Sequence, residues 1–238
     1  VLKKQKLDLI NCKFILIRQD PPFNLEYIST TYILDFLKDN VKIINNPTSI
    51  RNISEKLYSA RYQKFMPKTI FSQNILEIKK FLKAHKKIII KPIHGFGGND
   101  IHLLSKFNLK LIKKLIKKHS HIMCQKFLPK ISEGDRRVFL INGKIRGAIS
   151  RIPKKGSFLS NMGKGAKPIN IKLSKKEIRI SKIIGKELKK EKIFFAGIDF
   201  IDEKLNGDIN VTSPTGLKTL YDISKINLAK TFWRELKA

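Results

Sequence analysis

The chain has 238 residues, of which 42% are hydrophobic, so it is long and apolar enough to bury a core as one large or two small domains. It contains no unbroken apolar run of about 18 residues, so we expect no membrane-spanning helix. Val1 to Lys4 lack the pattern of a secretory signal. Cys12 and Cys124 match no metal or redox spacing, and we expect a reducing cytoplasm.

The charge is strongly positive, with 50 Lys and Arg against 19 Asp and Glu, a formal net charge of +31. Such a charge suggests nucleic acid or an anionic membrane surface as a possible binding partner. The excess is mostly Lys, however, and it is dispersed along the chain together with abundant Ile and Asn, a combination that AT-rich codons produce. The Lys pairs within 113–118 fit a solvated helix face opposite an apolar stripe. We therefore expect neither a nucleic-acid nor a membrane partner.

The first part of the chain alternates strand and helix. An apolar run at 14–17 predicts a strand that ends at Arg18, before the turn signal Asp20-Pro21-Pro22. Apolar spacing predicts a helix over 24–40, a strand over 41–44 and a second helix over 47–63.

The middle part predicts strands over 69–71, 88–90 and 101–104, with helices over 74–85 and 108–119. The last part predicts strands over 121–127, 137–141 and 145–151, with a hairpin at Asn142-Gly143. A long loop over 153–168, a helix over 174–191, and strands over 194–201 and 208–211 around Asn206-Gly207 follow, before closing helices. This order predicts an α+β fold.

Lys91 stands at the end of a buried strand, directly before the Gly-rich segment that holds Gly95, Gly97 and Gly98. Backbone N–H groups of glycines can approach an anion closely, and the lysine adds positive charge, so this segment predicts a flexible cover over phosphates. It lacks the ending of a Walker loop, and a Gly-rich hairpin alone is often only a tight turn.

Asp199 lies on one predicted strand, and Asp208 and Asn210 lie on the next. Residues two apart on a strand point the same way, and carboxylate and amide oxygens suit Mg²⁺ that also binds phosphates. The alternative is that these are only polar residues at the edge of a hairpin. The hydroxyl groups clustered at 212–215, beside the same site, make this alternative less favoured. The segment Gln125-Lys126-Phe127-Leu128-Pro129 leaves a strand and could offer backbone groups to adenine, with Asp135 near the ribose.

Taken together, these segments resemble the bacterial glutathione synthetase family of the ATP-grasp fold. The specific strings are Asp20-Pro21-Pro22-Phe23, within the matching segment Arg18 to Phe23, and Ile209-Asn210-Val211-Thr212-Ser213-Pro214-Thr215. The Gly-rich segment from Lys91 to Gly98 and the strands with Gly197-Ile198-Asp199 and Asp208 are shared by many ATP-grasp ligases. The other matching segments are Glu55-Lys56-Leu57, Gln125 to Pro129, Gly134 to Val138 and Arg151-Ile152-Pro153. They occur in the order of the family and cover nearly the whole chain.

The resemblance implies two α/β subdomains that enclose ATP, preceded by the remnant of an α/β pre-ATP-grasp domain. Residues 1–46 would end that first domain, 47–122 would form the small subdomain with the Gly-rich loop, and 123–238 the carboxyl-terminal subdomain with the lid loop 153–168 and the Mg²⁺ site. The front of the family's first domain is missing here, so we expect an amino-terminally truncated fragment, and a homo-oligomer (dimer or tetramer) in the full-length protein.

The implied activity is ATP-dependent ligation of γ-glutamylcysteine to glycine through an acyl phosphate, with Mg²⁺ or alternatively Mn²⁺. The implied nucleotide-binding residues are Lys56, Lys91, Gly95, Phe96, Gly97, Gly98, Gln125, Lys126, Phe127, Leu128 and Asp135. Arg137 and Arg151 would act on the reacting groups, and Asp199, Asp208 and Asn210 would ligate the metal. Arg18, Arg151, Asn210, Ser213 and Thr215 would contact the substrates.

The chain departs from the family pattern at four positions. Asp208 stands where Glu is usual, Gln19 where Lys is usual, and Leu159 and Lys167 where the lid tends to carry Arg. The alternatives are another ATP-grasp carboxylate–amine ligase of the glutamate-adding type, a basic nucleic-acid-binding protein and an inactive remnant.

Overall fold

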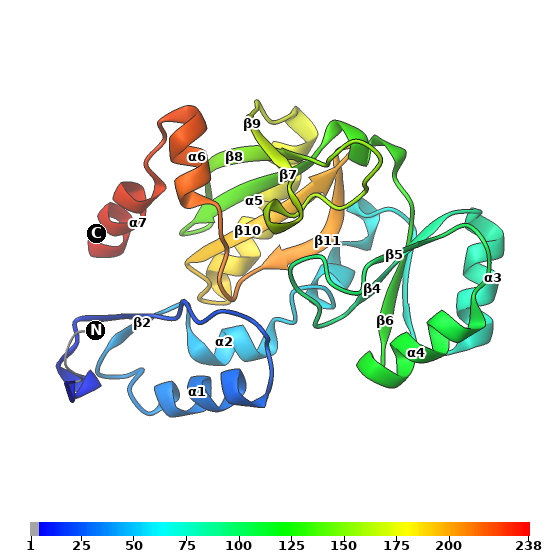
Figure 1. The fold of residues 1–238 in the computed structure, drawn as a ribbon. Helices are drawn as coiled ribbons and strands as arrows, with labels where there is room; N and C mark the ends of the chain where they lie inside the picture. Colours follow the sequence, from blue (N-terminus) through cyan, green and yellow to red (C-terminus); the bar gives the residue numbers. More distant parts are fainter. Residues whose placement is uncertain (1–4) are drawn as a thin grey trace.

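The structure, a computed structural model, describes residues 5–238 and contains three sheets and seven α-helices among them (Figure 1). Val1 to Lys4, where the sequence shows no signal pattern, lie outside the described residues. Mixed helices and sheets confirm the predicted α+β class. None of the helices described combines the length and the hydrophobicity that crossing a membrane requires.

The amino-terminal unit pairs two short parallel strands beside two helices. Its elements are η1 (Leu9–Asn11), β1 (Phe14–Leu16), α1 (Leu25–Asp35), β2 (Lys42–Ile44), α2 (Pro47–Asn52) and η2 (Tyr58–Phe65). The helix expected over 24–40 therefore ends at Asp35. The helix expected over 47–63 is interrupted: α2 ends at Asn52, the Glu55 carbonyl accepts a hydrogen bond from Ile209 N, and the chain becomes helical again only in the 3-10 helix η2.

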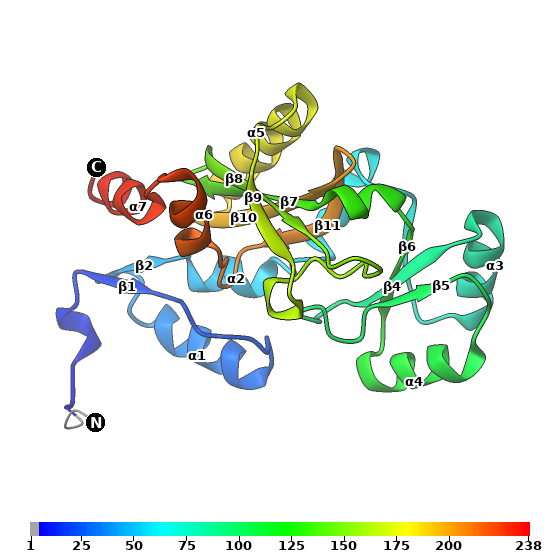
Figure 2. The ribbon, with the colours of Figure 1, turned by 45° about the horizontal axis from the view of Figure 1, so that its top comes forward.

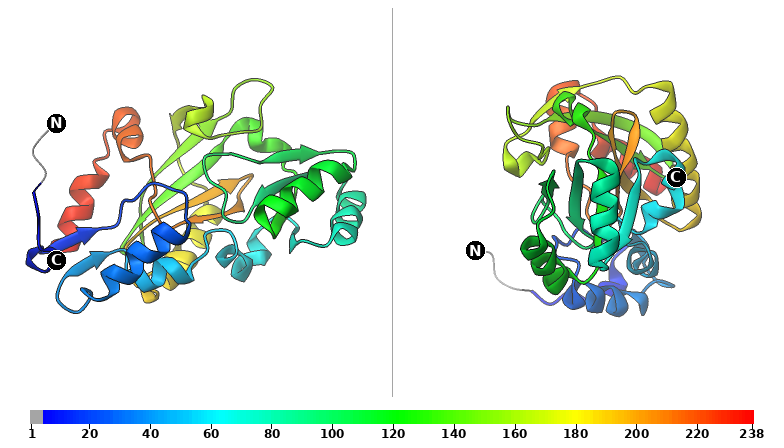
Figure 3. Two further views of the ribbon diagram at one scale, coloured as in Figure 1. Left: turned by 60° about the horizontal axis from the view of Figure 1, so that its bottom comes forward. Right: turned by 90° about the vertical axis from the view of Figure 1, so that its right-hand side faces the viewer.

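An antiparallel four-stranded sheet has the order β3-β6-β4-β5. Its elements are β3 (Thr69–Ser72), α3 (Ile75–His85), β4 (Ile88–Pro92), β5 (His102–Leu104), α4 (Leu109–His119) and β6 (Ile122–Lys126). Figures 1 and 3 show α3 and α4 on the outer side, away from the larger sheet. Their buried residues Ile78, Leu82, Ile112 and Leu115 pack on the sheet, and the lysines of 113–118 face outward, as predicted.

A second antiparallel sheet has the order β11-β10-β7-β8-β9. Its elements, with the helices around it, are η3 (Pro129–Glu133), β7 (Asp135–Ile141), β8 (Lys144–Ile152), η4 (Met162–Lys164), β9 (Lys167–Asn170), α5 (Lys175–Lys190), β10 (Phe195–Ile201), β11 (Lys204–Asn210), α6 (Leu217–Ser224) and α7 (Leu228–Lys237). Helix α5 covers one face and α6 and α7 cover one end of the other (Figure 2).

The last hairpin turns at a different place from the predicted one. Strands β10 and β11 are joined at Asp202 and Glu203, both with positive φ (51° and 57°). Gly207, expected at the turn, lies inside β11 with φ 88°, and a Cβ there would come within 2.3 Å of the Met123 Cε atom. The glycine is therefore favoured by its positive φ within the strand, with the flexible ends of Met123 and Met66 close by, and not by a turn. The expected loop 153–168 likewise gives way to β9 at Lys167.

Asn45 joins the amino-terminal unit to the larger sheet. Its side-chain amide donates to the carbonyls of Phe195 (2.8 Å) and Val211 (2.7 Å), and its oxygen accepts from the N–H groups of Phe194 (2.9 Å) and Phe195 (2.8 Å). The residue is 4% exposed, so its full hydrogen-bonding capacity is used away from water.

Asn45→Ala should lower the free energy of unfolding by about 2 to 4 kcal/mol, because it leaves several buried backbone groups without partners. Urea unfolding followed by circular dichroism measures this change. Asn40→Ala, at an exposed position five residues earlier, should change the stability by less than about 0.5 kcal/mol. Equal effects of the two variants would show that Asn45 does not hold the units together.

Candidate active site

One cavity of about 520 Å³ brings together the residues that the sequence analysis singled out. It is lined by segments of both larger sheets, by the Gly-rich loop and by the lid loop. The predicted site residues that line it are Lys56, Lys91, Gly95, Phe96, Gly97, Gly98, Gln125, Lys126, Phe127, Leu128, Asp135, Arg137, Arg151, Asp199, Asp208, Asn210, Ser213 and Thr215. Arg18 is the predicted residue that is not among them; its guanidinium donates to the Pro214 carbonyl at 3.0 Å.

The alternation of strands places four charged side chains on the same face of the larger sheet. In β7, Val138 and Leu140 pack toward α5, while Phe139 and Ile141 pack on the opposite side. Side chains alternate between the two faces of a strand, so Asp135 and Arg137 lie on the same face as Phe139 and Ile141. Arg151 on β8 stands directly opposite Asp135, and Asp199 on β10 stands directly opposite Arg137, so both lie on this face as well. All four side chains therefore belong to the face away from α5.

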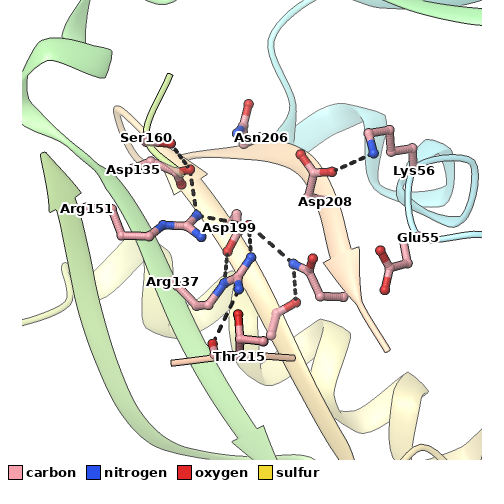
Figure 4. Close-up of polar contacts among 12 residues, drawn as sticks. Glu55, Lys56, Asp135, Arg137, Arg151, Ser160, Asp199, Asn206, Asp208 and Thr215 are labelled. Carbon is pink, nitrogen blue, oxygen red and sulfur yellow. Dashed lines mark hydrogen bonds and ion pairs between the residues drawn. The ribbon is translucent and has the colours of Figure 1, made fainter. Parts of the chain in front are cut away.

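These four side chains form one buried network (Figure 4). Arg137 donates to both oxygens of Asp199, from Nε at 2.8 Å and from Nη2 at 2.7 Å. Arg151 Nη2 lies 3.1 Å from Asp199 Oδ2 and donates to Asp135 Oδ2 at 2.6 Å. Arg137 also donates to the Thr215 carbonyl at 3.4 Å. Two guanidinium groups are thus fixed side by side by two carboxylates at the wall of the cavity.

The pKa values in this network follow from burial and from the arrangement of charges. Burial raises the pKa of Asp199, but Arg137 and Arg151 outweigh it and hold that pKa well below its usual range. Burial raises the pKa of Asp135 above its ordinary value, and the contacts with Arg151 and Ser160 do not offset it. Burial lowers the pKa of Arg151, yet the neighbouring carboxylates raise it overall, so this side chain stays charged.

Strand β11 and two lysines form a second cluster of charged side chains at the cavity. Leu205, Gly207 and Ile209 are buried, so Asn206, Asp208 and Asn210 share the other face, as the spacing predicts. Asp208 Oδ1 lies 3.2 Å from Lys56 Nζ, and its Oδ2 lies 3.5 Å from Lys91 Nζ. Burial raises the pKa of Asp208, but the two ammonium groups outweigh it and the pKa lies below its ordinary value. Two buried lysines thus face one carboxylate.

The Gly-rich loop lies directly over these lysines. Lys56 Nζ donates to the Gly95 carbonyl at 2.8 Å, while Lys91 Nζ donates to the carbonyl and the side chain of Asn206, both at 2.9 Å. Gly97 and Gly98 have φ values of 62° and 77°, which only glycine adopts freely. The loop can therefore turn its backbone toward an anion held by the lysines.

The segment after β6 borders the other end of the cavity. The Lys126 N–H donates to the Lys68 carbonyl at 2.9 Å, so only the Lys126 carbonyl remains to contact a ligand. Leu128 is buried and packs with Ile131 and Ile201, an apolar wall suited to a flat ring. Gln125 is buried and donates to Thr69 Oγ1 at 3.1 Å.

Glu55 is a site residue that the sequence analysis named only as part of a motif. Its Oε1 accepts hydrogen bonds from Val211 N (3.0 Å), Thr212 N (3.2 Å) and Thr212 Oγ1 (2.8 Å). Ser213 Oγ then donates to the Gln19 carbonyl at 2.7 Å. Glu55 therefore fixes the hydroxyl-bearing segment after β11 while its neighbour Lys56 points into the cavity (Figure 4). Asn206, which accepts hydrogen bonds from Lys91, is a further residue of the site, and no sequence pattern predicts that role.

Asp199→Asn should lower the free energy of unfolding at pH 7 by about 3 kcal/mol, because it leaves the buried Arg137 without a carboxylate and Arg151 with Asp135 alone. The folded-state pKa of Asp199 is depressed, so its stabilisation is complete above the unfolded-state value of about 4 and is lost as the pH falls further. In urea titrations between pH 7 and pH 3, the difference from wild type should therefore shrink below about pH 4. Asp222→Asn, on an exposed helix turn, serves as control; a pH-independent difference would contradict the assignment.

Comparisons with known proteins agree with this architecture. The chain matches the family model of the prokaryotic glutathione synthetase ATP-grasp domain over residues 55–225 and that of the N-terminal domain over residues 1–51. It is 33% identical to glutathione synthetase of Rhodopseudomonas palustris over 98% of this chain and 75% of that protein. It is 38% identical to glutathione synthetase of Prochlorococcus marinus subsp. pastoris over 90% of this chain and 70% of that protein.

Solved structures confirm the predicted ATP-grasp fold. D-cycloserine synthetase DcsG superimposes with a TM-score of 0.72 at 12% identity, over 98% of this chain and 87% of that one. D-alanine–D-alanine ligase from Bacillus anthracis, complexed with ATP, superimposes with a TM-score of 0.66 at 15% identity, over 97% of this chain and 83% of that one. The family models and the curated relatives show that the chain, with its buried charges around this cavity, belongs to the prokaryotic glutathione synthetase family, a family of ATP-dependent carboxylate–amine ligases with the ATP-grasp fold.

Proposed function

We propose that this chain uses ATP to join γ-glutamylcysteine to glycine through an acyl phosphate, giving glutathione, ADP and phosphate. The observation that carries the proposal is the arrangement of two lysines, two arginines and three carboxylates around one cavity in a chain of this family. A carboxylate and a polyphosphate repel each other, and fixed positive charges on both sides of the cavity offset that repulsion.

The donor set fits Mg²⁺ that is shared with phosphates, with Mn²⁺ as the alternative. No cluster of three or more His, Cys, Asp or Glu side chains able to hold a metal occurs within residues 5–238. Asp199, Asp208 and Asn210 instead offer two carboxylates and one amide oxygen beside two phosphate-binding lysines. Mg²⁺ is commonly held by one or two carboxylates together with substrate phosphates, so these residues fit the ion. Bound Mg-ATP would supply the phosphoryl group and part of the neutralising charge.

The chain's own residues would bind and orient the nucleotide. Lys56 and Lys91 would hold the phosphates, with Gly95 to Gly98 covering them. The Lys126 carbonyl and the Leu128 N–H would receive the adenine edge. Asp135 would lie near the ribose, and its buried Oδ1 has no hydrogen-bond partner among the described residues.

Arg137 and Arg151 would stabilise the negative charge that develops as the carboxylate takes up the phosphoryl group. Their bonds to Asp199 and Asp135 fix their orientation before substrate binds, so no reorganisation is needed at the reacting step. The hydroxyl groups of Ser213 and Thr215 would contact the glycine end of the product, on a segment that Glu55 and Arg18 hold in place.

We also propose that the protein works in the cytoplasm as a homo-oligomer. Both cysteines are free, as a reducing compartment requires. Helix α1 leaves Leu25, Tyr32 and Ile33 more than half exposed on the side opposite its buried residues, which supports association with another copy.

Phosphate release from ATP should require both γ-glutamylcysteine and glycine, and glutathione should form in equal amount. Replacement of glycine by glutamate should abolish product formation. Phosphate release that responds to glutamate and not to glycine would instead establish the glutamate-adding alternative.

Lys91→Ala should weaken ADP binding about 10- to 100-fold, because it removes a buried charged donor to phosphate. Isothermal titration calorimetry measures the affinity, and circular dichroism checks the fold. Lys87→Ala, at an exposed position just before β4, is the matched control. Unchanged ADP affinity in Lys91→Ala would refute the phosphate-binding role.

Asp208→Asn should change the response of nucleotide binding to Mg²⁺. Without the metal, ADP should bind more tightly than to wild type, because a negative charge between the two lysines is gone. With Mg²⁺, the gain in ADP affinity should be about tenfold smaller than in wild type, because a metal ligand is lost. Asp202→Asn, at the turn of the same hairpin, should keep the wild-type response. An unaltered gain in Asp208→Asn would remove this residue from the metal site.

A further inference from the structure

The lid loop between β8 and β9 has an exposed part and a buried part. Lys154 to Ser157 are exposed, as are Met162 to Lys164. Between them, the segment Phe158 to Asn161 turns inward, and Ser160 is only 8% exposed. A short polar segment is thus held against the cavity within an otherwise solvated loop. Figure 2 shows the loop before β9 beside the connection between β4 and β5.

The inward segment contacts three different parts of the cavity. Phe158 packs against Leu128 and its apolar neighbours, the wall proposed for adenine. Asn161 occupies the space beside Gly98, where its Oδ1 would lie 2.4 Å from a Cβ added to that glycine. Ser160 Oγ donates a hydrogen bond of 2.6 Å to Asp135 Oδ2. The first two contacts are apolar or steric, whereas the third is a directed bond to a charged group.

The bond from Ser160 reaches the oxygen that also holds Arg151. Asp135 Oδ2 accepts from both Ser160 Oγ and Arg151 Nη2, each at 2.6 Å (Figure 4). Asp135 is 4% exposed, and its second oxygen has no partner among the described residues. Loss of the serine hydroxyl would leave a buried carboxylate with a single donor, so the closed position of the lid and the solvation of Asp135 depend on each other.

We propose that the hydrogen bond from Ser160 to Asp135 is the latch that holds the lid loop closed over Arg151 during the reaction. Ser160 is a positioning residue in this assignment, because it acts on the reacting groups through Asp135 and Arg151. Its effect on the reaction rests on the proposed function above, whereas the closed position of the loop does not.

The latch has a chemical consequence for the acyl phosphate. When the lid is closed, the glycine amine attacks the acyl carbon, forms the amide bond and releases phosphate. When the lid is open, water attacks instead, regenerates the γ-glutamylcysteine carboxylate and releases the same phosphate. A weakened latch therefore leaves phosphate release in place but reduces the glutathione formed per phosphate.

Limited trypsin digestion tests the latch without turnover. Lys154, Lys155 and Lys164 lie in exposed parts of the lid, and mass spectrometry identifies cleavage after each of them. In Ser160→Ala, cleavage at these sites, with and without Mg-ADP, should be about tenfold faster than in wild type. Ser157→Ala removes a hydroxyl from the exposed part of the same loop, where it accepts only from Leu159 N, and should be cleaved like wild type. Equal cleavage of Ser160→Ala and wild type would overturn the proposal.

The ratio of phosphate released to glutathione formed provides the second readout. It should stay near one in wild type and in Ser157→Ala, and rise several-fold in Ser160→Ala with the KM for ATP little changed. A lower kcat at an unchanged ratio would mean that Ser160 only supports the structure, and would also overturn the latch. If wild type forms no glutathione, the proposed function fails, while the digestion result still decides whether the latch exists.

Discussion

The buried network of Arg137, Arg151, Asp199 and Asp135 is the interaction on which the site depends. Taking four charged groups out of water is costly, and hydrophobic residues of similar volume would stabilise a sheet face as well or better. The network is therefore poorly explained by stability alone. Its effect is to keep two guanidinium groups charged, immobile and close together at the wall of a cavity, where their field on a ligand is little weakened by water.

The rest of the fold can be understood from what this network requires. Three antiparallel strands must present charged residues on one face while the other face carries the core under α5, and the alternation along β7 does both. The lysines must come from outside this sheet, because its own charges are already paired. Lys91 arrives on β4 of the smaller sheet, and Lys56 arrives on a connection that Glu55 ties to β11. A strand of the smaller sheet and a connecting segment thus bring two lysines to the same cavity as the two arginines of the larger sheet.

Motif residues were predictable from sequence because each carries a local signature, such as glycines after a strand-ending lysine or two polar residues two apart. The positions that failed are those where a distant contact decides. Asn206-Gly207 has the composition of a turn, yet Gly207 stands within a strand, where its φ of 88° suits glycine. The helix expected to Gln63 is interrupted after Asn52, where Glu55 bonds to β11, and it resumes only as the 3-10 helix η2. Asn45 and Asn206 gave no signal, since a single buried asparagine resembles any other polar residue.

The lid illustrates a balance that no local pattern encodes. A loop that protects a reactive intermediate must exclude water, but it must also open once in every cycle to release product. An extensive apolar contact would close it too firmly, and a fully solvated loop would not close. The inward segment resolves this with one aromatic contact, one steric fit at Gly98 and one short hydrogen bond to a buried carboxylate. Because that carboxylate also orients Arg151, the arrangement of the reacting charges and the exclusion of water depend on the same atom, Asp135 Oδ2.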